Sequence, residues 1–172
     1  MDELERYFID LISGVRSSRF IDASATKYVI KHILVDPPAA SGIGMPVLTW
    51  MHRDASAMKG ERRKAAYKKL GDTALFLSGV FPSYVTSTPG GLGFYVDMGT
   101  NAYGQASSMV PRRLIDEFRT IVLVINDAIA NTTLCQRLET SNIVDMHAFD
   151  GSGAFRYALA LRNMMPIGNG IA

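Results

Sequence analysis

The three histidines of the chain are the first residues to weigh for metal or acid–base chemistry. His32, His52 and His147 lie far apart, and none stands in an H-E-x-x-H pattern or beside a second ligand at helical spacing. Cys135 is the single cysteine, which excludes a cysteine cage, and we expect its thiol to be packed rather than nucleophilic. Local motifs therefore predict no metal site, although distant ligands could still meet in the folded protein.

The Gly-rich segment Pro89–Gly93 invites a phosphate-binding interpretation, because bare backbone N–H groups before a helix can hold an anion. A dinucleotide fingerprint starting at Gly91 would need a glycine where Val96 stands, and no convincing strand precedes the segment. The run Gly151-Ser152-Gly153 lacks the spacing of a nucleophile elbow and is typical of a turn that starts a helix. We therefore expect a flexible loop at residues 86–93 rather than a phosphate cradle.

Basic residues gather in one short stretch. They are Lys59, Arg62, Arg63, Lys64, Lys68 and Lys69, opposed only by Glu61. On a helix these side chains would cover about half of the surface, as a phosphate-contacting face does. The net charge of the whole chain is only +2, however, whereas nucleic-acid-binding domains are usually strongly basic. This balance favours a solvated helix face, and we expect no sequence-specific nucleic-acid binding.

The strongest candidate for a ligand site lies in and near the stretch from Leu70 to Gly104. Aromatic, small and acidic residues recur there at helical spacing. A pocket between helices at 72–81 and 94–107 would be lined by Tyr95, Asp97, Tyr103 and His52. The alternative is tight helix–helix packing, in which Asp72 caps a helix, Asp97 makes a polar contact, and Gly99 and Gly104 allow another helix to approach closely.

Helical periodicity dominates the whole chain, and alternation typical of strands is rare. Helices are expected at residues 2–15, 24–36, 47–58, 61–70, 73–80, 94–107 and 111–130, with shorter ones at 133–139, 143–148 and 153–164. The expected N-caps include Asp2 and Ser24, and Pro46 is expected at the first position of its helix. Gly71-Asp72 is interpreted as a helix end followed by a new N-cap. We predict an all-α fold, a multi-helix bundle with orthogonal packing around a central helix at 111–130.

Length and composition are those of one globular domain. The chain has 172 residues, of which 48% are hydrophobic and 20% charged, so one helical domain over 1–172 with a frayed tail at 167–172 is expected. The longest strongly apolar run, Ile121–Ile125, is too short to cross a bilayer. The acidic, amphipathic start MDELERYFIDL does not have the pattern of a secretory signal. We therefore expect a cytoplasmic protein without a membrane partner.

Two segments resemble the signature of an uncharacterised family of bacterial helical proteins. Leu70-Gly71-Asp72, Leu75-Phe76, Ser78-Gly79 and Phe81-Pro82 match its LGDxxLFxSGxFP segment, and Tyr95, Met98-Gly99 and Ala102-Tyr103-Gly104 match its YxxMGxxAYG segment. The chain departs from the family at Phe94, where paired tyrosines are usual, and in its Gly-rich loop. The resemblance implies an all-helical fold and a bacterial origin, and it implies no activity or cofactor.

Two functional hypotheses follow. The first is a non-enzymatic binding or assembly protein that forms a homodimer, because nine methionines, eight phenylalanines and seven tyrosines exceed what one visible core needs. Residues 2–16, with Tyr7, Phe8 and Ile12 on one face, are the expected contact. The second is a small-molecule-binding protein or enzyme that uses the pocket at Tyr95, Asp97, Tyr103 and His52. The sequence identifies no cofactor and leaves open whether the protein is an enzyme.

Overall fold

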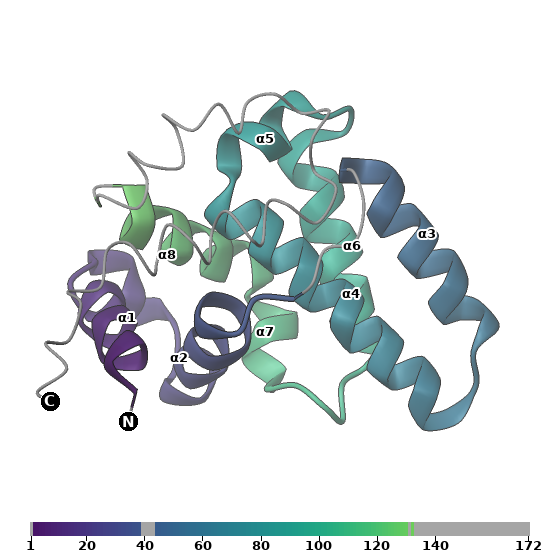
Figure 1. Ribbon diagram of the computed structural model, residues 1–172, viewed down its shortest axis with the longest axis horizontal. Coiled ribbons are helices and arrows are strands. Elements are labelled where there is room, and N and C mark those ends of the chain that lie inside the picture. The colour runs from purple at the N-terminus through teal and green to yellow at the C-terminus, as the bar shows by residue number, and fades with distance from the viewer. Residues whose placement is uncertain (1, 39–43, 131, 133–172) are drawn as a thin grey trace, which may run out of the picture.

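The computed structural model describes residues 2–38, 44–130 and 132, and the side chains of 44–47 are not described. Helical elements follow one another along this part of the chain (Figure 1). They are α1 (Glu3–Ser13), the 3₁₀ helix η1 (Arg16–Phe20), α2 (Ala23–Val29), the π-helix η2 (Ile30–Val35), α3 (Gly44–Ala57), α4 (Gly60–Val80), α5 (Pro82–Ser87), α6 (Gly91–Gln105), α7 (Arg112–Asp116) and α8 (Phe118–Ala130). The described residues include no strand, which confirms the all-α prediction.

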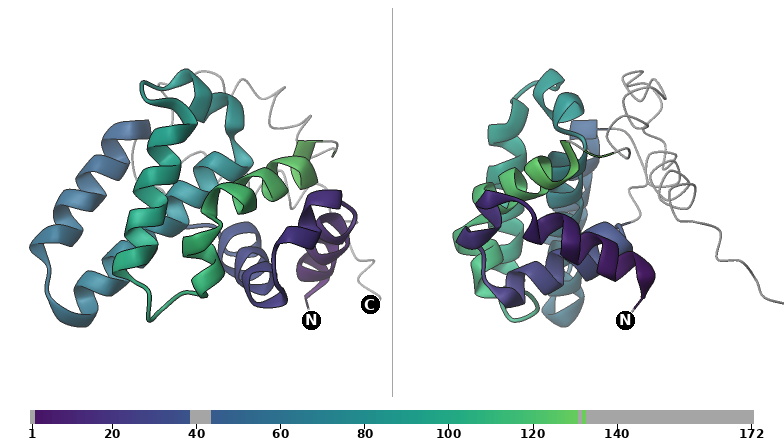
Figure 2. Two further views of the ribbon diagram at one scale, coloured as in Figure 1. Left: turned by 180° about the vertical axis from the view of Figure 1, so that it is seen from behind. Right: turned by 90° about the vertical axis from the view of Figure 1, so that its left-hand side faces the viewer.

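Helix α4 is the axis of the domain. It packs against α3, α6 and α8, and also contacts α5 and η2. In Figure 1 it crosses the middle of the molecule, with α3 on one side and α1 and α2 on the other, and from behind α6 lies across it (Figure 2). Every residue from Leu70 to Phe81 is buried, so this half of α4 meets neighbours on all its faces. The central helix is therefore α4 and not the expected helix at 111–130.

The expected helix at 111–130 is two helices that meet at Glu117. Its backbone angles, φ −128° and ψ 27°, end α7 before α8 begins. The bend has a packing role, because α7 packs on α6 while α8 continues to α4 and α1. Leu114 and Phe118, on either side of the bend, are both buried. The apolar stripe continues through both helices, but its two halves pack on different neighbours.

The expected break at Gly71-Asp72 is wrong, because α4 continues through both residues. Gly71 is not in the left-handed region; among the described residues, the glycines with positive φ are Gly60, Gly90 and Gly91, which lie at the starts of α4 and α6. A Cβ at Gly71 would lie 2.4 Å from the Tyr103 ring. The glycine therefore permits a close contact inside the core instead of ending a helix.

Several helix ends also differ from expectation. The residue that caps α2 is Asp22 and not Ser24, since its Oδ1 accepts the backbone N–H of Ala25 at 2.7 Å. Asp2 precedes α1 but makes no side-chain cap hydrogen bond. The loop expected at 86–93 is shorter, because α5 extends to Ser87 and α6 begins at Gly91. The helices expected beyond residue 132 lie outside the described residues.

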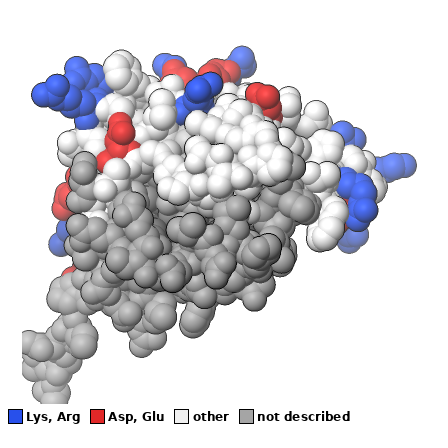
Figure 3. All heavy atoms as spheres, turned by 90° about the horizontal axis from the view of Figure 1, so that it is seen from above, with Lys and Arg blue, Asp and Glu red and all other residues white. Residues whose placement is uncertain are grey.

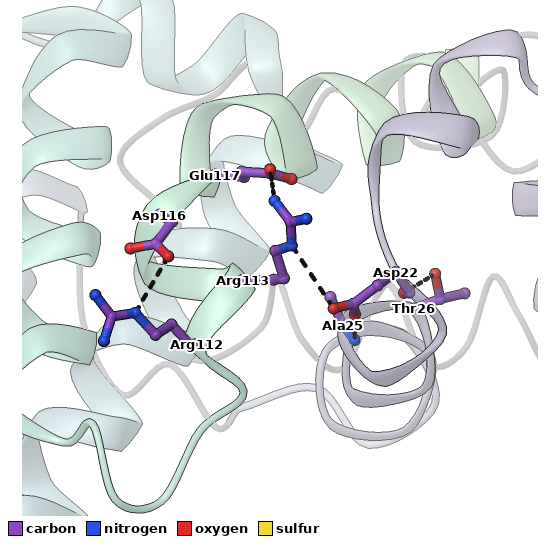
Figure 4. Close-up of polar contacts among 7 residues, drawn as sticks. All are labelled: Asp22, Ala25, Thr26, Arg112, Arg113, Asp116 and Glu117. Carbon is purple, nitrogen blue, oxygen red and sulfur yellow. Dashed lines mark hydrogen bonds and ion pairs between the residues drawn. The ribbon is translucent and has the colours of Figure 1, made fainter.

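A chain of charged side chains, exposed except for the half-buried Glu117, connects α7 to the start of α2 (Figure 4). Arg113 pairs with Glu117 one turn along, and its Nε lies 3.8 Å from Oδ2 of Asp22, the α2 cap. Arg112 pairs with Asp116 at 3.3 Å. Exposed pairs of this kind contribute little individually, so they orient α7 more than they stabilise it. No helix in the described ranges combines the length and apolarity needed to cross a bilayer.

Candidate functional site

The most buried charge of the described core is the carboxylate of Asp72, in the middle of α4. Its Oδ1 accepts the hydroxyls of Tyr28 at 2.7 Å and Tyr103 at 2.8 Å, and its Oδ2 lies 2.8 Å from Nζ of Lys68. We call these four residues the Asp72 centre. Because the tyrosines come from α2 and α6, the centre joins three helices through one carboxylate.

Local geometry explains how the centre forms. Lys68 and Asp72 are four residues apart on α4, which brings their side chains together on one face. The Tyr28 and Tyr103 rings pack edge to face with centroids 6.4 Å apart, and the ammonium of Lys68 lies 5.1 Å from the centre of the Tyr28 ring. Three donors thus satisfy a side chain that would be costly to bury alone.

These contacts make the centre sensitive to alkaline pH. Burial, and then the neighbouring Asp72 charge, raise the pKa of Tyr103 well above its usual 10.0, and the pKa of Tyr28 rises for the same two reasons. The folded state therefore holds protons that the unfolded chain releases above about pH 10. The stability supplied by these tyrosines is fully present below that pH and is lost as the pH rises further.

We predict that urea stability declines above pH 10, and that ionisation of the buried tyrosines, read as absorbance near 295 nm, coincides with loss of helical ellipticity. In Tyr103→Phe the alkaline part of the decline should be smaller, although the stability at pH 8 is also lower. Full tyrosine ionisation in a protein that keeps its helical spectrum would contradict this account.

A separate cavity of about 330 Å³ lies between α3, α4 and α6. His52 of α3 and Tyr67 of α4 form one wall, with ring centroids 5.7 Å apart in an edge-to-face arrangement. The other wall is a stripe of α6 side chains: Phe94, Asp97, Met98, Asn101 and Gln105. We call this the α3–α6 cavity. It brings together His52 and Asp97, two of the four residues that the sequence analysis proposed for a ligand site.

The other two, Tyr95 and Tyr103, do not line this cavity. Both are fully buried, at 0% exposure, and Tyr103 belongs to the Asp72 centre. Helix geometry separates them from Asp97, because side chains three or four residues apart share a face. Asp97 therefore lies on the stripe that includes Phe94 and Asn101, whereas Tyr95 lies on the buried stripe with Gly99. Counting helix positions from Asp97 would have identified the correct cavity wall in the sequence.

Close packing between helices is confirmed at one of the two glycines named for it. A Cβ at Gly99 would lie 2.2 Å from Cζ of Phe118, whereas a Cβ at Gly104 would meet no atom within 4 Å. At Gly99, the buried Phe118 ring of α8 therefore packs directly against the backbone of α6. Gly104 is exposed, and the expectation that it faces a neighbouring helix is wrong.

The basic stretch at 59–69 is partly engaged within the protein. Lys64 pairs with Glu61, Lys68 belongs to the Asp72 centre, and Arg63 donates to Gln105 at 3.3 Å. From above, Lys and Arg side chains gather near the edges of the described surface and leave its middle largely uncharged (Figure 3). These contacts engage three of the six basic side chains, and the expected absence of sequence-specific nucleic-acid binding remains a prediction.

Neither metal-ligating residues nor similarity to known proteins points to a function for the described part of the chain. In the part of the chain that the structure describes, no three His, Cys, Asp or Glu residues are grouped to hold a metal ion. Cys135, His147 and Ser152 lie outside that part. The resemblance to a bacterial helical family remains a prediction. No protein-family model, curated protein or solved structure matches this chain.

Proposed function

We propose that this chain is a non-enzymatic binding protein that takes a small polar molecule in the α3–α6 cavity. A volume of about 330 Å³ lies within the range of small-molecule sites. Side chains from three helices converge on it, and two of them are aromatic and four can form hydrogen bonds through an amide, carboxylate or imidazole group. This combination is typical of sites that hold a ligand by one flat face and orient it by a few polar contacts.

The observation that carries the proposal is the carboxylate of Asp97. It is exposed beside the cavity, and within the described structure it has neither an ion pair nor a hydrogen bond to the protein. The side-chain amide of Asn101, which also lines the cavity, likewise has no hydrogen bond to the protein within the described structure. The ligand best suited to these groups has a donor for Asp97 and a flat apolar part for Phe94 and Tyr67.

The described lining offers an imidazole, a phenol, a carboxylate and two amides. These groups suit recognition of a ligand by hydrogen bonds and charge. A bacterial, cytoplasmic setting is part of the same proposal, and it is supported by the family resemblance and by the presence of one cysteine in the sequence.

Binding of benzamidine tests this proposal, because the probe joins a flat ring to a cationic donor. We expect saturable binding by calorimetry, and we expect Asp97→Asn to weaken it about tenfold or more, as loss of a charged hydrogen bond does. Asp54→Asn on α3 removes an exposed carboxylate outside the lining and should leave binding unchanged. Equal affinity in Asp97→Asn and the parent protein, or no saturable binding, would contradict the proposal.

Self-association is a second candidate, and α3 is the element that favours it. Among the described elements α3 makes extensive contact with α4 alone. It exposes Trp50 at 58%, and Met58, just after its end, at 41%. Residues 2–16 offer less than expected, because Phe8 and Ile12 are buried in the core of the same chain. We therefore propose that a homodimer would use α3.

Light scattering at micromolar concentration checks this second candidate. We expect the mass of a dimer for the full chain and the mass of a monomer for Trp50→Glu, with an unchanged helical spectrum. Phe20→Glu changes another exposed aromatic residue, away from α3, and should leave the dimer intact. A monomer in the parent protein refutes self-association, and a dimer that persists in Trp50→Glu refutes the role of α3.

A further inference from the structure

A second polar cavity lies on the other side of α4, next to the Asp72 centre. Its volume is about 350 Å³, and it is bounded by η2, the following Pro37 and Pro38, and α4. The side chains that could bind a ligand there are His32, Asp36, Lys68, Lys69 and Asp72. No role was expected for this cavity from the sequence, because its residues come from two segments without a shared motif.

The part of the cavity formed by the Asp72 centre already has its charges paired. The Asp72 carboxylate accepts two hydroxyls and the Lys68 ammonium, so its charge and that of Lys68 offset each other. The side chain of Asp72 is only 8% exposed and that of Lys68 27%. A ligand would meet these two groups as a fixed, nearly neutral surface whose positions are set by the helices on which they lie.

The described side chains that remain supply one cation, one anion and one imidazole. Lys69 and Asp36 are both exposed, and the described structure gives neither side chain an ion pair or a hydrogen bond. Burial and the nearby Lys68 lower the pKa of His32, with a smaller lowering from Lys31, while Asp72 and Asp36 oppose the shift. The neutral imidazole can therefore donate one hydrogen bond and accept another at neutral pH.

The backbone at His32 is unusual as well. The residue lies in η2, a π-helix, which is a rare element that frequently occurs at functional sites. Its ring packs against Tyr28 of the Asp72 centre, with centroids 4.7 Å apart. The π-helix thus carries His32 to the boundary between the Asp72 centre and the open part of the cavity.

We propose that this cavity binds a small zwitterion of the amino-acid type, with the ligand carboxylate at Lys69, its ammonium at Asp36, and a hydrogen bond to His32. Charge balance argues against a simple anion, because the two lysines are offset by the two carboxylates of Asp36 and Asp72. A molecule with both charges matches both free groups, whereas one with a single charge leaves one of them unmatched.

The test uses the full chain and a series of unbranched amino carboxylates from glycine to 6-aminohexanoate. The ring C–H signals of His32, assigned with His32→Asn, are followed by NMR. We expect at least one member of the series to give a saturable shift. Its N-acetyl derivative and its amide, which each lack one charge, should bind at least about tenfold more weakly, as loss of a charged contact predicts.

Substitutions at Lys69 and Asp36 test which side chain binds the ligand carboxylate and which binds the ligand ammonium. Lys69→Met and Asp36→Asn should each weaken binding about tenfold or more, while Lys27→Met and Asp54→Asn, exposed and outside the lining, should not. All four change exposed side chains, and circular dichroism verifies that they fold. The proposal is overturned if no zwitterion shifts His32, if the singly charged derivatives bind equally well, or if Lys69→Met and Asp36→Asn bind as the parent protein does.

Discussion

Replacing Asp72 with alanine is expected to lower the free energy of unfolding by about 2–6 kcal/mol, because each of two buried hydroxyls loses its acceptor at about 1–3 kcal/mol. Lys68 also loses its partner, but its side chain is 27% exposed and can turn toward water. A loss of this size is a large fraction of the stability of an ordinary domain. Asp72→Asn keeps an acceptor and should lose less.

Urea denaturation with a matched carboxylate measures this effect. Asp116→Ala removes another carboxylate that pairs with a basic residue four positions away, but this pair is exposed. Its expected cost is below about 1 kcal/mol. The two variants therefore compare a carboxylate that joins three helices with one that joins neighbouring turns of a single helix. Similar denaturation midpoints for both would show that the Asp72 centre does not hold the fold together.

Two alanine substitutions on α6 are expected to act with opposite signs. Gly99→Ala puts a Cβ 2.2 Å from the buried Phe118 ring, and we expect a loss of about 1–3 kcal/mol from overpacking. Gly104→Ala puts the same methyl group into open space on the same helix, where alanine is favoured over glycine by up to about 1 kcal/mol. Helix propensity is common to both changes, so the difference between them isolates packing.

Thermal unfolding of the two variants measures the difference in stability between them. Gly99→Ala should melt below the parent protein, and Gly104→Ala at or above it. Gly71→Ala is expected to resemble Gly99→Ala, since its Cβ would meet the Tyr103 ring at 2.4 Å. If Gly99→Ala melts at or above the parent protein, α6 and α8 do not approach as closely as described.

The sequence was sufficient for the fold class because helix periodicity is a local property. The stripe of α1 and the stripe at 114–129 follow from spacing alone, and both pack on the core, although several of their side chains are only partly buried. Helix ends were harder to predict, since a glycine within an apolar run can end a helix or admit a neighbour's ring. At Gly71 the deciding atom belongs to Tyr103, 32 positions away, and no local pattern records that contact.

The candidate site was likewise predictable in part: residue type identified some of its members, and helix packing decided the others. His52 and Asp97 were named from their residue types, and the structure places both at the α3–α6 cavity. Tyr95 and Tyr103 were named for the same reason, but the face of α6 on which each lies directs it into the core. Asp72 was interpreted as a cap because capping is the common role of an aspartate after glycine. Its three actual partners depend on how α2, α4 and α6 pack.

The central claim, that the α3–α6 cavity is a ligand site, is tested most directly by the side-chain amide signals of Asn101 and Gln105. Both amides line the cavity, and each can be followed by NMR in the full chain as benzamidine is added. The account predicts saturable shifts at Asn101 and Gln105 with the same concentration dependence, and in Asp97→Asn it predicts that both shifts need about tenfold or more benzamidine. Unmoved amides, or saturable shifts confined to residues outside the cavity, would contradict it.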